Sequence, residues 1–384
     1  FFKQKTAYEM LRSLVGSEMC IRDRILAEDV KENIGQAKVA VIGVGGGGSN
    51  AVNRMYRNKI PHIEYATINT DAQALSHSDV PQKLRVGDRL ARGMGVGGNP
   101  EKGRLCHEED REHILEIVGG QDMVFIAAGM GGGTGTGGAP VVASVAKEAG
   151  ALTVGVVTKP FAFEGSQRTK QAIEGVARLE EQCDTLIVVP NDRLLLATET
   201  NISMDMAFRR ADDVLRQGVQ SIAELILVPG EINLDFADVT TIMKNAGPAW
   251  MAIGTGKGED KAIEAAEMAI SSPLLEQTID GAKGVLFNIT GGSDLSINEI
   301  EQASQTISSV VDPEANIIFG TVTDEKLNNE MRITLIGTGF PSLESPYKSE
   351  KNETNISSSD RPLSNQESSR NNKNDLDIPP FLRK

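Results

Sequence analysis

The sequence predicts an α/β fold: a doubly wound parallel sheet, then a long central helix, a second and smaller α+β domain, and a disordered C-terminal tail. Three observations lead to this prediction. Short apolar runs alternate with helical stretches in the first half of the chain, which is typical of doubly wound parallel sheets. The 39 glycines cluster at the ends of these runs, where such sheets bind ligands. From residue 341 the composition changes abruptly to Ser, Asn, Glu, Lys and Asp.

The expected strands of the first domain are short apolar runs, which indicate strands buried on both faces. They cover residues 38–43, 63–69, 123–128, 152–158 and 185–190, with a helical stretch at 139–149. A long amphipathic helix then begins with Ser203 as its N-cap and ends before Pro229. Three further strands are expected in the second domain, at 284–289, 316–322 and 331–336.

These elements divide the chain into a first domain at 25–202, a central helix at 203–230 and a second domain at 231–340. Residues 341–374 contain almost no apolar side chains and cannot bury enough surface to fold, so a disordered linker is expected there. The last residues, 375–384, become apolar again and are expected to be a docking peptide.

Residues 1–24 do not begin with Met and lack the apolar core of a signal peptide. They resemble translated sequencing-adapter text and are expected to be non-native. A divergent native extension is the alternative.

Composition excludes several classes of function. The net charge of −14 argues against a nucleic-acid-binding body and against direct contact with an anionic membrane. No apolar run approaches the roughly 20 residues that span a bilayer. The three cysteines show no metal or redox spacing, which suggests a reducing cytosol. We therefore expect a cytoplasmic protein without membrane insertion.

A first glycine-rich loop lies at the end of the first strand and leads into a helix. Glycines allow backbone N–H groups to approach an anion, and the helix N-terminus adds partial positive charge, so the loop predicts phosphate binding. Alone it also fits the dinucleotide fingerprint of an NAD-dependent oxidoreductase, or merely a tight turn. Its candidate residues are Gly45, Gly46, Gly47, Gly48, Ser49 and Asn50.

A second glycine-rich loop argues against the oxidoreductase, because a dinucleotide fold does not need it. Two loops at neighbouring strand ends would surround a polyphosphate, with threonine hydroxyls as donors. Neither loop contains Lys and no P-loop motif occurs, which leaves backbone dipoles and a divalent cation, Mg²⁺, to balance the phosphate charge. The candidates are Gly131, Gly132, Gly133, Thr134, Gly135 and Thr136.

The segment Gly131-Gly-Gly-Thr-Gly-Thr-Gly137 is similar to the signature of the tubulin/FtsZ GTPase family, and the resemblance extends over 37–340 and the C-terminal peptide. It implies GTP and GDP as ligands, with Mg²⁺ bound through their phosphates. It further implies assembly-dependent hydrolysis of GTP to GDP and phosphate, and self-polymerisation into cytoskeletal filaments at the bacterial division site. A tubulin-like filament protein with little hydrolysis remains an alternative.

The resemblance also implies residues that contact the ribose and the base. Glu164 and Arg168 should contact the ribose and phosphate region, although from the sequence alone they could be a surface ion pair. Phe208 and Asp212 share a helix face, where the ring could stack on guanine and the carboxylate accept from its N1–H and 2-amino group. Phe208 could instead be plain core. Polar residues expected to complete the pocket are Asn50, Asn69, Asp71 and Asn191.

The resemblance places the catalytic loop at the start of the second domain, in Asn233, Asp235 and Asp238. The two carboxylates would orient a water for attack on the γ-phosphate. The long helix should hold them roughly 30 Å from the nucleotide of their own subunit. They would therefore act on a neighbour stacked head-to-tail, a contact that generates a filament. An ordinary acidic helix N-cap is the alternative.

The C-terminal peptide resembles one that binds membrane-tethering division proteins. Its expected apolar anchors are Ile378, Phe381 and Leu382, and its expected charged anchors are Arg383 and Lys384. A frayed terminus without function is the alternative.

Other residues are expected to have structural roles. His107 and His113 lie in a charged run and are expected on a solvated helix face, because their spacing does not fit a metal site. Cys106 and Cys183 are expected to be packed small residues. Trp250 has no functional interpretation from the sequence.

Overall fold

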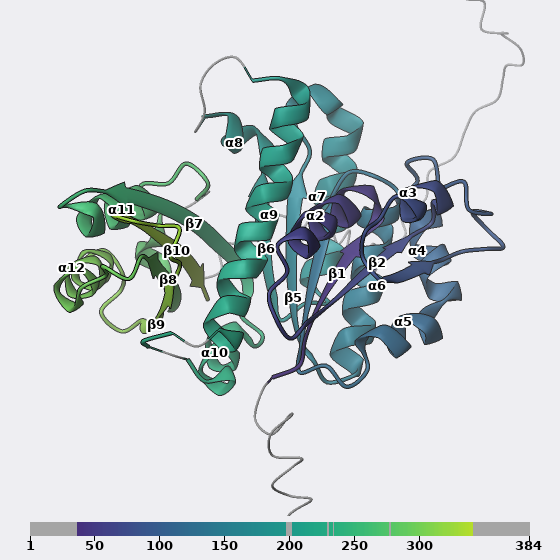
Figure 1. The fold of residues 1–384 in the computed structure, drawn as a ribbon. Helices are drawn as coiled ribbons and strands as arrows, with labels where there is room; N and C mark the ends of the chain where they lie inside the picture. The colour runs from purple at the N-terminus through teal and green to yellow at the C-terminus, as the bar shows by residue number, and fades with distance from the viewer. Residues whose placement is uncertain (1–36, 197–201, 229, 233, 276–277, 341–384) are drawn as a thin grey trace, which may run out of the picture. The chain divides into compact units, whose positions relative to one another are not determined.

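The computed structural model describes residues 37–196, 202–228, 230–232, 234–275 and 278–340 (Figure 1). Their strands form one ten-stranded sheet in the order β3-β2-β1-β4-β5-β6-β7-β10-β8-β9. The expected segment 1–24, the linker 341–374 and the docking peptide 375–384 lie outside the described residues. Predictions about those segments therefore stay predictions.

The first six strands are parallel to their neighbours. They are β1 (Val39–Val44), β2 (Ile63–Asn69), β3 (Gln82–Arg85), β4 (Met123–Gly129), β5 (Leu152–Lys159) and β6 (Thr185–Pro190). The five predicted strands of this domain are confirmed, and their near-continuous burial explains why they read as apolar runs. The short edge strand β3 was not predicted, because its side chains are mostly exposed.

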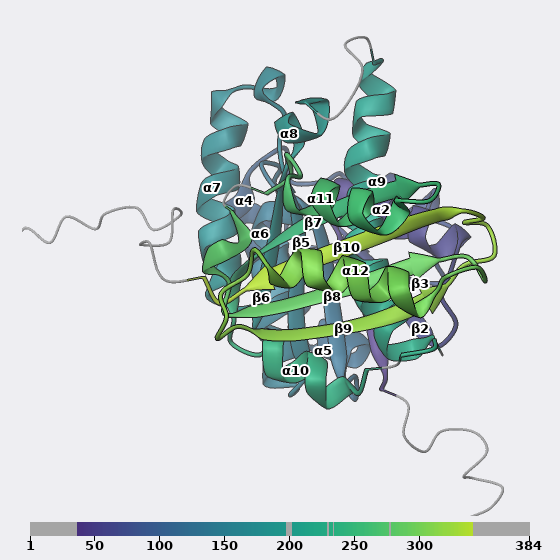
Figure 2. The same ribbon diagram turned by 90° about the vertical axis from the view of Figure 1, so that its left-hand side faces the viewer.

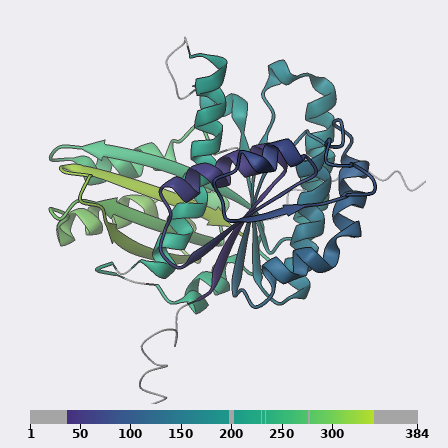
Figure 3. The same ribbon diagram turned by 45° about the vertical axis from the view of Figure 1, so that its right-hand side comes forward.

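Helices cover both faces of these strands, as predicted for a doubly wound sheet (Figure 3). One face packs on α2 (Gly45–Arg57, purple) and on the long helix α9 (Met204–Leu227). The other face packs on α4 (Pro100–Glu109), α5 (Arg111–Val118), α6 (Thr134–Glu148) and α7 (Ser166–Glu180). Shorter elements are α3 (Ala72–Ser76), the 3₁₀ turn η1 (Ala162–Glu164) and α8 (Asn191–Leu196).

The central helix α9 has the predicted N-cap, since the Ser203 hydroxyl accepts from the backbone N–H of Met206 at 3.3 Å. Its 24 residues give a length of about 36 Å. Its buried stripe includes Ala211, Leu215 and Ile222, which pack against the first sheet domain. The helix therefore connects the end of the first domain to the start of the second.

The second half contains β7 (Gly247–Lys257), β8 (Gly284–Gly291), β9 (Asn316–Thr323) and β10 (Glu330–Thr338). Figure 2 shows α11 (Lys261–Ile270) and α12 (Ile297–Ser308) over one face of these strands, where they share a buried core. The remaining elements are α10 (Phe236–Met243) and the 3₁₀ turn η2 (Ile279–Gly281). The three predicted strands of this domain are confirmed.

Strand β7 joins the two halves and was not predicted. Its first residues pair with β6 in parallel, and from Trp250 onward it pairs with β10 in the antiparallel sense. The Trp250 side chain is buried and its ring lies edge-on to Phe340 at 6.4 Å. Trp250 therefore packs the core of the second half.

Candidate functional site

A cavity of about 390 Å³ lies at the carboxyl ends of the parallel strands, where open α/β sheets bind ligands. Both glycine loops, η1, the start of α7 and the first turns of α9 contribute to it. It is lined by Gly46, Gly47, Asn50, Gly129, Met130, Gly132, Gly133, Thr134, Gly135, Thr158, Pro160, Glu164, Arg168, Asn191, Phe208, Ala211 and Asp212.

The two glycine loops touch each other through their backbones. Gly45 has φ +71°, and a Cβ added there would lie 2.7 Å from the backbone nitrogen of Gly135. A Cβ on Gly48 would lie 2.1 Å from the carbonyl oxygen of Ala127, so any side chain is excluded. The helix N-termini of α2 and α6 therefore meet at one cavity, and neither helix has an acidic residue in its first turn. This arrangement favours an anion with several phosphates.

The two threonines of the second loop have different surroundings. Thr134 lines the cavity, and its hydroxyl lies 2.7 Å from that of Thr70. Thr136 is buried, and its hydroxyl oxygen accepts from the backbone N–H of Gly131 at 2.9 Å. Gly131 itself has φ +97°. Thr136 therefore stabilises the conformation of the loop without lining the cavity.

Several other predicted residues lie beside the cavity without lining it: Gly45, Gly48, Ser49, Asn69, Asp71, Gly131 and Thr136. The side-chain amide oxygen Oδ1 of Asn69 accepts from the backbone N–H of Asp71 at 3.3 Å. Asp71 in turn caps α3, because its carboxylate accepts from the N–H of Gln73 at 2.8 Å. Both side chains thus hold the turn that follows β2.

Glu164 and Arg168 form the ion pair that their spacing allows, with 2.6 Å between Arg168 Nη1 and Glu164 Oε2. The other carboxylate oxygen of Glu164 accepts from the backbone N–H of Phe161 at 3.0 Å. Both side chains nevertheless lie on the cavity wall. The ion-pair interpretation and the binding interpretation are therefore compatible.

Phe208 is 38% exposed and lines the cavity, so it is not plain core. Its ring lies edge-on to the buried Phe161 at 5.4 Å and to Phe163 at 6.3 Å. Phe161 and Phe163 are themselves stacked at 5.1 Å. These two aromatic neighbours, which the sequence interpretation missed, fix the orientation of the Phe208 ring.

Asp212 shares this wall, and its carboxylate lies 3.3 Å from the Arg54 guanidinium of α2. Burial raises the pKa of Asp212 to about 6, although the charge of Arg54 opposes the shift. Asp213 forms its own ion pair with Arg216 at 2.7 Å and does not line this cavity. Arg54 was missed, although its spacing of four from Asn50 places both on one helix face.

Two buried polar atoms near the cavity have no hydrogen-bond partner among the described residues: Asn191 Oδ1 and Ser49 Oγ. Asn191 is 5% exposed and lines the cavity. A buried polar group without a partner costs about 1–3 kcal/mol, so a polar ligand that reaches Asn191 would be stabilised. Together with the glycine loops, this fits a nucleotide.

The sequence interpretation also missed cavity residues that carry no motif: Gly129, Met130, Thr158, Pro160 and Ala211. Most of them lie at or just after the carboxyl ends of β4 and β5. The strand-end rule could have identified these positions once the strand boundaries were correct.

The proposed catalytic residues are remote from this cavity. Asp235 is the N-cap residue of α10 but makes no side-chain capping hydrogen bond, and Asp238 lies in the first turn. Both are exposed, and Asn233 lies outside the described residues. Figure 1 shows α10 at the opposite end of α9 from α8, which follows β6. Along α9 alone, Asp212 and Leu227 are separated by about 22 Å.

The expectation of a solvated helix face is wrong for His107, which is fully buried on α4. The reason is that Gly138 of α6 leaves room for its ring. His113 is exposed, as expected, and lies 3.4 Å from Asp110. Cys106 and Cys183 are buried and free, which confirms their expected packing role.

In the part of the chain that the structure describes, no helix is long and apolar enough to cross a membrane.

The chain matches two family models: "Tubulin/FtsZ family, GTPase domain" over residues 38–198, and "FtsZ family, C-terminal domain" over residues 247–341. It is similar to an empty FtsZ dimer from M. jannaschii, with 44% identity and a TM-score of 0.78 over 83% of this chain and 92% of that one. It also shares the fold of CetZ2 from Haloferax volcanii, a GTPγS-bound protofilament, with 20% identity and a TM-score of 0.66 over 80% of this chain and 94% of that one.

Proposed function

The chain belongs to the tubulin/FtsZ family of GTPases, and from this premise we propose that it forms head-to-tail filaments of bacterial cell division. In these filaments GTP bound by one subunit is hydrolysed at its contact with the next. The oxidoreductase alternative is set aside, because the family hydrolyses GTP and the second glycine loop takes part in the same cavity.

One observation carries the proposal: the exposed carboxylates of Asp235 and Asp238 stand at the far end of α9 from the cavity. Within one subunit they cannot reach a nucleotide bound there. A neighbour stacked in the same orientation would bring its pair to the γ-phosphate. Such a contact is heterologous and does not close, so it generates a filament.

In the proposed site, the N–H groups at the starts of α2 and α6 hold the phosphates. Phe208 stacks on the guanine, and the Asp212 carboxylate accepts from its N1–H and 2-amino group. Glu164 and Arg168 face the ribose and phosphates. Adenine offers no paired donors on that edge, which explains a preference for GTP.

Mg²⁺ is proposed to bind through the nucleotide phosphates, where it would neutralise charge that builds up during phosphoryl transfer. The described residues contain no group of three His, Cys, Asp or Glu side chains that could hold a metal ion. Asp235 and Asp238 orient the attacking water, and Asn233 is proposed to assist them. Positioning is their main contribution, because a carboxylate is a weak base.

We further propose that the last residues dock membrane-tethering division proteins, so that filaments gather at the division site in the cytoplasm. The apolar side chains of this peptide and Arg383 would make the contact. The proposed functional units are the GTP-binding domain 25–202, the helix 203–230 and the catalytic-loop domain 231–340. Pull-down of division proteins by the full chain and by a Phe381→Ala variant tests the docking.

The test of trans hydrolysis measures GTP turnover per subunit against the concentration of the full chain. A threshold followed by rising turnover is expected, and Asp238→Ala should abolish it. An experiment that mixes two inactive variants tests trans hydrolysis more directly. Asp238→Ala keeps an intact cavity, while Asp212→Ala keeps intact catalytic carboxylates, so their mixture should recover turnover that neither variant has alone.

Two other outcomes have a clear meaning. Constant turnover per subunit from dilute solution upward, without recovery in the mixture, would show a self-contained site. Filaments that form with GTP but release no phosphate would favour the tubulin-like protein with little hydrolysis.

A further inference from the structure

The N-terminal halves of α4 and α6 touch through their backbones. A Cβ on Gly103 of α4 would lie 2.3 Å from the carbonyl oxygen of Gly133, and a Cβ on Gly137 of α6 would lie 1.9 Å from that of Pro100. Both distances are far below any real contact, so these positions admit only glycine. The second glycine loop therefore has the cavity on one side and the backbone of α4 on the other.

One turn further along α4, the imidazole of His107 packs against Gly138 of α6. The side chain is fully buried, and its Nδ1–H donates to the carbonyl oxygen of Gly103 at 2.8 Å. A Cβ on Gly138 would lie 2.2 Å from the His107 ring. The ring thus occupies the space that a side chain at 138 would need.

This packing is specific to a neutral ring. Burial lowers the pKa of His107 to about 4, so the imidazole is uncharged at neutral pH. Its Nε2 atom is buried and has no partner among the described residues. His107 therefore acts here through its shape and through its bond to the backbone of α4.

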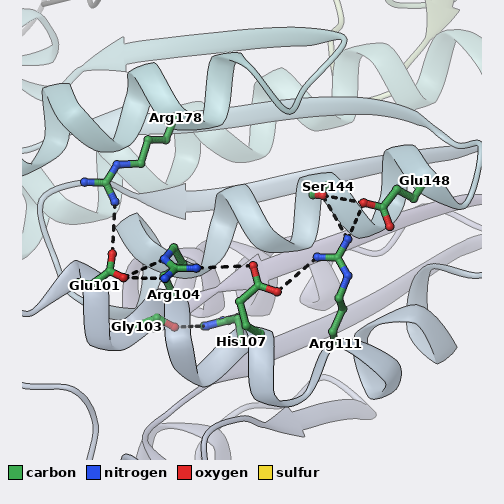
Figure 4. A network of polar contacts seen from close by, with 9 residues as sticks. Glu101, Gly103, Arg104, His107, Arg111, Ser144, Glu148 and Arg178 are labelled. Carbon is green, nitrogen blue, oxygen red and sulfur yellow. Dashed lines mark hydrogen bonds and ion pairs between the residues drawn. The ribbon is translucent and has the colours of Figure 1, made fainter.

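Polar contacts at the surface around this packing link α4 to α7 and α5 to α6 (Figure 4). Arg104 lies 2.6 Å from Glu101, which also lies 3.9 Å from Arg178 of α7. Arg111 of α5 lies 2.5 Å from Glu148 of α6. These pairs are largely exposed, and such pairs contribute little to stability. The spacing of α4 and α6 is therefore set by the backbone contacts at Gly103 and Gly137 together with the buried contact of His107 with Gly138.

Helix α6 begins at Thr134, inside the loop that lines the cavity, and Gly138 lies one turn later. A shift of α6 against α4 would therefore displace the loop N–H groups directly. We propose that His107 is a positioning residue for the phosphate-binding loop, because its fit against Gly138 fixes where residues 132–135 stand at the cavity. This inference rests on the proposed function, since it assumes that the loop binds nucleotide phosphates.

The experiment exchanges the sizes of the two residues in the full chain. Gly138→Ala should clash with the ring, and packed interiors accommodate added volume poorly. GDP affinity should fall at least about tenfold. When GTP turnover is measured, the KM for GTP should rise while kcat changes little. His107→Ala/Gly138→Ala removes the clash and should restore GDP affinity to within about threefold of the wild type. Ser144→Ala, which removes a polar contact of α6 outside this packing, is the matched control and should bind GDP normally.

Hydrogen exchange of the amides of residues 132–135, measured without nucleotide, gives a readout independent of binding. Exchange should be faster in Gly138→Ala and return to the wild-type rate in the double variant. A purely structural role would lower the melting temperature and leave GDP affinity and loop exchange of the folded protein unchanged. That result, or a double variant as weak as Gly138→Ala, would overturn the proposal.

Two further outcomes are decisive. If Gly138→Ala does not fold, a double variant that folds and binds GDP supports the proposal. A double variant that folds but does not bind contradicts it, and so does a folded His107→Ala variant that binds GDP as tightly as the wild type. A wild-type chain that binds no guanine nucleotide would contradict the proposed function, whereas unchanged loop exchange in Gly138→Ala would contradict this inference alone.

Discussion

The guanidinium of Arg54 lies 3.3 Å from the carboxylate of Asp212, and its Nη1 also donates to the carbonyl oxygen of Arg209 at 3.3 Å. Arg54 belongs to α2, which begins in the first glycine loop, while Asp212 belongs to α9. One helix therefore supplies both the first phosphate-binding turn and the cation beside the proposed guanine-binding carboxylate. The ionisation of Asp212 therefore depends on a residue of the helix that begins in the first glycine loop.

GDP affinity should fall as the pH is lowered through about 6, because only the ionised carboxylate of Asp212 accepts both guanine donors. The raised pKa places this change near neutrality, with a loss of up to about tenfold per pH unit below the midpoint. Titration calorimetry between pH 5 and 8 measures it. Asp212→Asn is the control. The phosphates of GDP titrate as before, so only the part of the pH dependence that Asp212 causes should disappear.

Arg54→Gln should move that midpoint to higher pH, because the cation that favours the ionised carboxylate is removed. GDP binding at pH 7 should weaken accordingly. Arg57→Gln, on the same helix but paired with Asp79 at 3.2 Å, is the matched control. A midpoint that is the same in Arg54→Gln and the wild type would show that Arg54 does not set the charge of Asp212.

Thr136→Val should destabilise the protein and weaken GDP binding. The substitution keeps the shape but removes the hydroxyl oxygen that accepts from the N–H of Gly131, which leaves a buried donor unpaired. The expected loss is about 1–3 kcal/mol in the free energy of unfolding, measured with urea. Thr136→Ser retains the acceptor and should lose much less. A loss in Thr136→Ser as large as that in Thr136→Val would show that the hydrogen bond to Gly131 does not account for the effect.

Much of the fold was predictable because its strands are buried on both faces. The run 185–190, for example, matches β6 residue for residue. Strand β7 was missed because glycines and alternating burial interrupt its apolar pattern, and its pairing with both β6 and β10 is a tertiary property. The edge strand β3 lacks apolar side chains to signal it.

The candidate site was predictable where a local motif carries it, as in the two glycine loops. Arg54 and Phe163 were missed because they support Asp212 and Phe208 from other elements, and no local spacing reveals such contacts. His107 was misplaced for the opposite reason. Its charged neighbours indicate a solvated face. Its burial is possible only because Gly138, 31 positions later, has no side chain.

Trp250 should report on the core of the second half, because it is the only tryptophan in the sequence and is buried beside Phe340. Its fluorescence emission should be blue-shifted in the folded protein and shift to the red on unfolding. Trp250→Ala should cost about 3–5 kcal/mol in the free energy of unfolding, while Trp250→Phe should cost less. Both variants should bind GDP normally when folded, since Trp250 does not line the cavity. A large change in affinity would assign it a role at the site.

His107 should also make the protein sensitive to acid. Its pKa is about 4 in the folded chain, whereas an unfolded chain binds the proton near 6.5. The unfolded state therefore binds more protons between these values, so the free energy of unfolding falls as the pH drops from 6.5 to 4, by about 3 kcal/mol in total. Urea unfolding of wild type and His107→Ala across this range isolates the contribution, because their other titrating groups are shared. The difference between the two should shrink steadily toward pH 4. Parallel curves for wild type and His107→Ala would mean that His107 titrates normally.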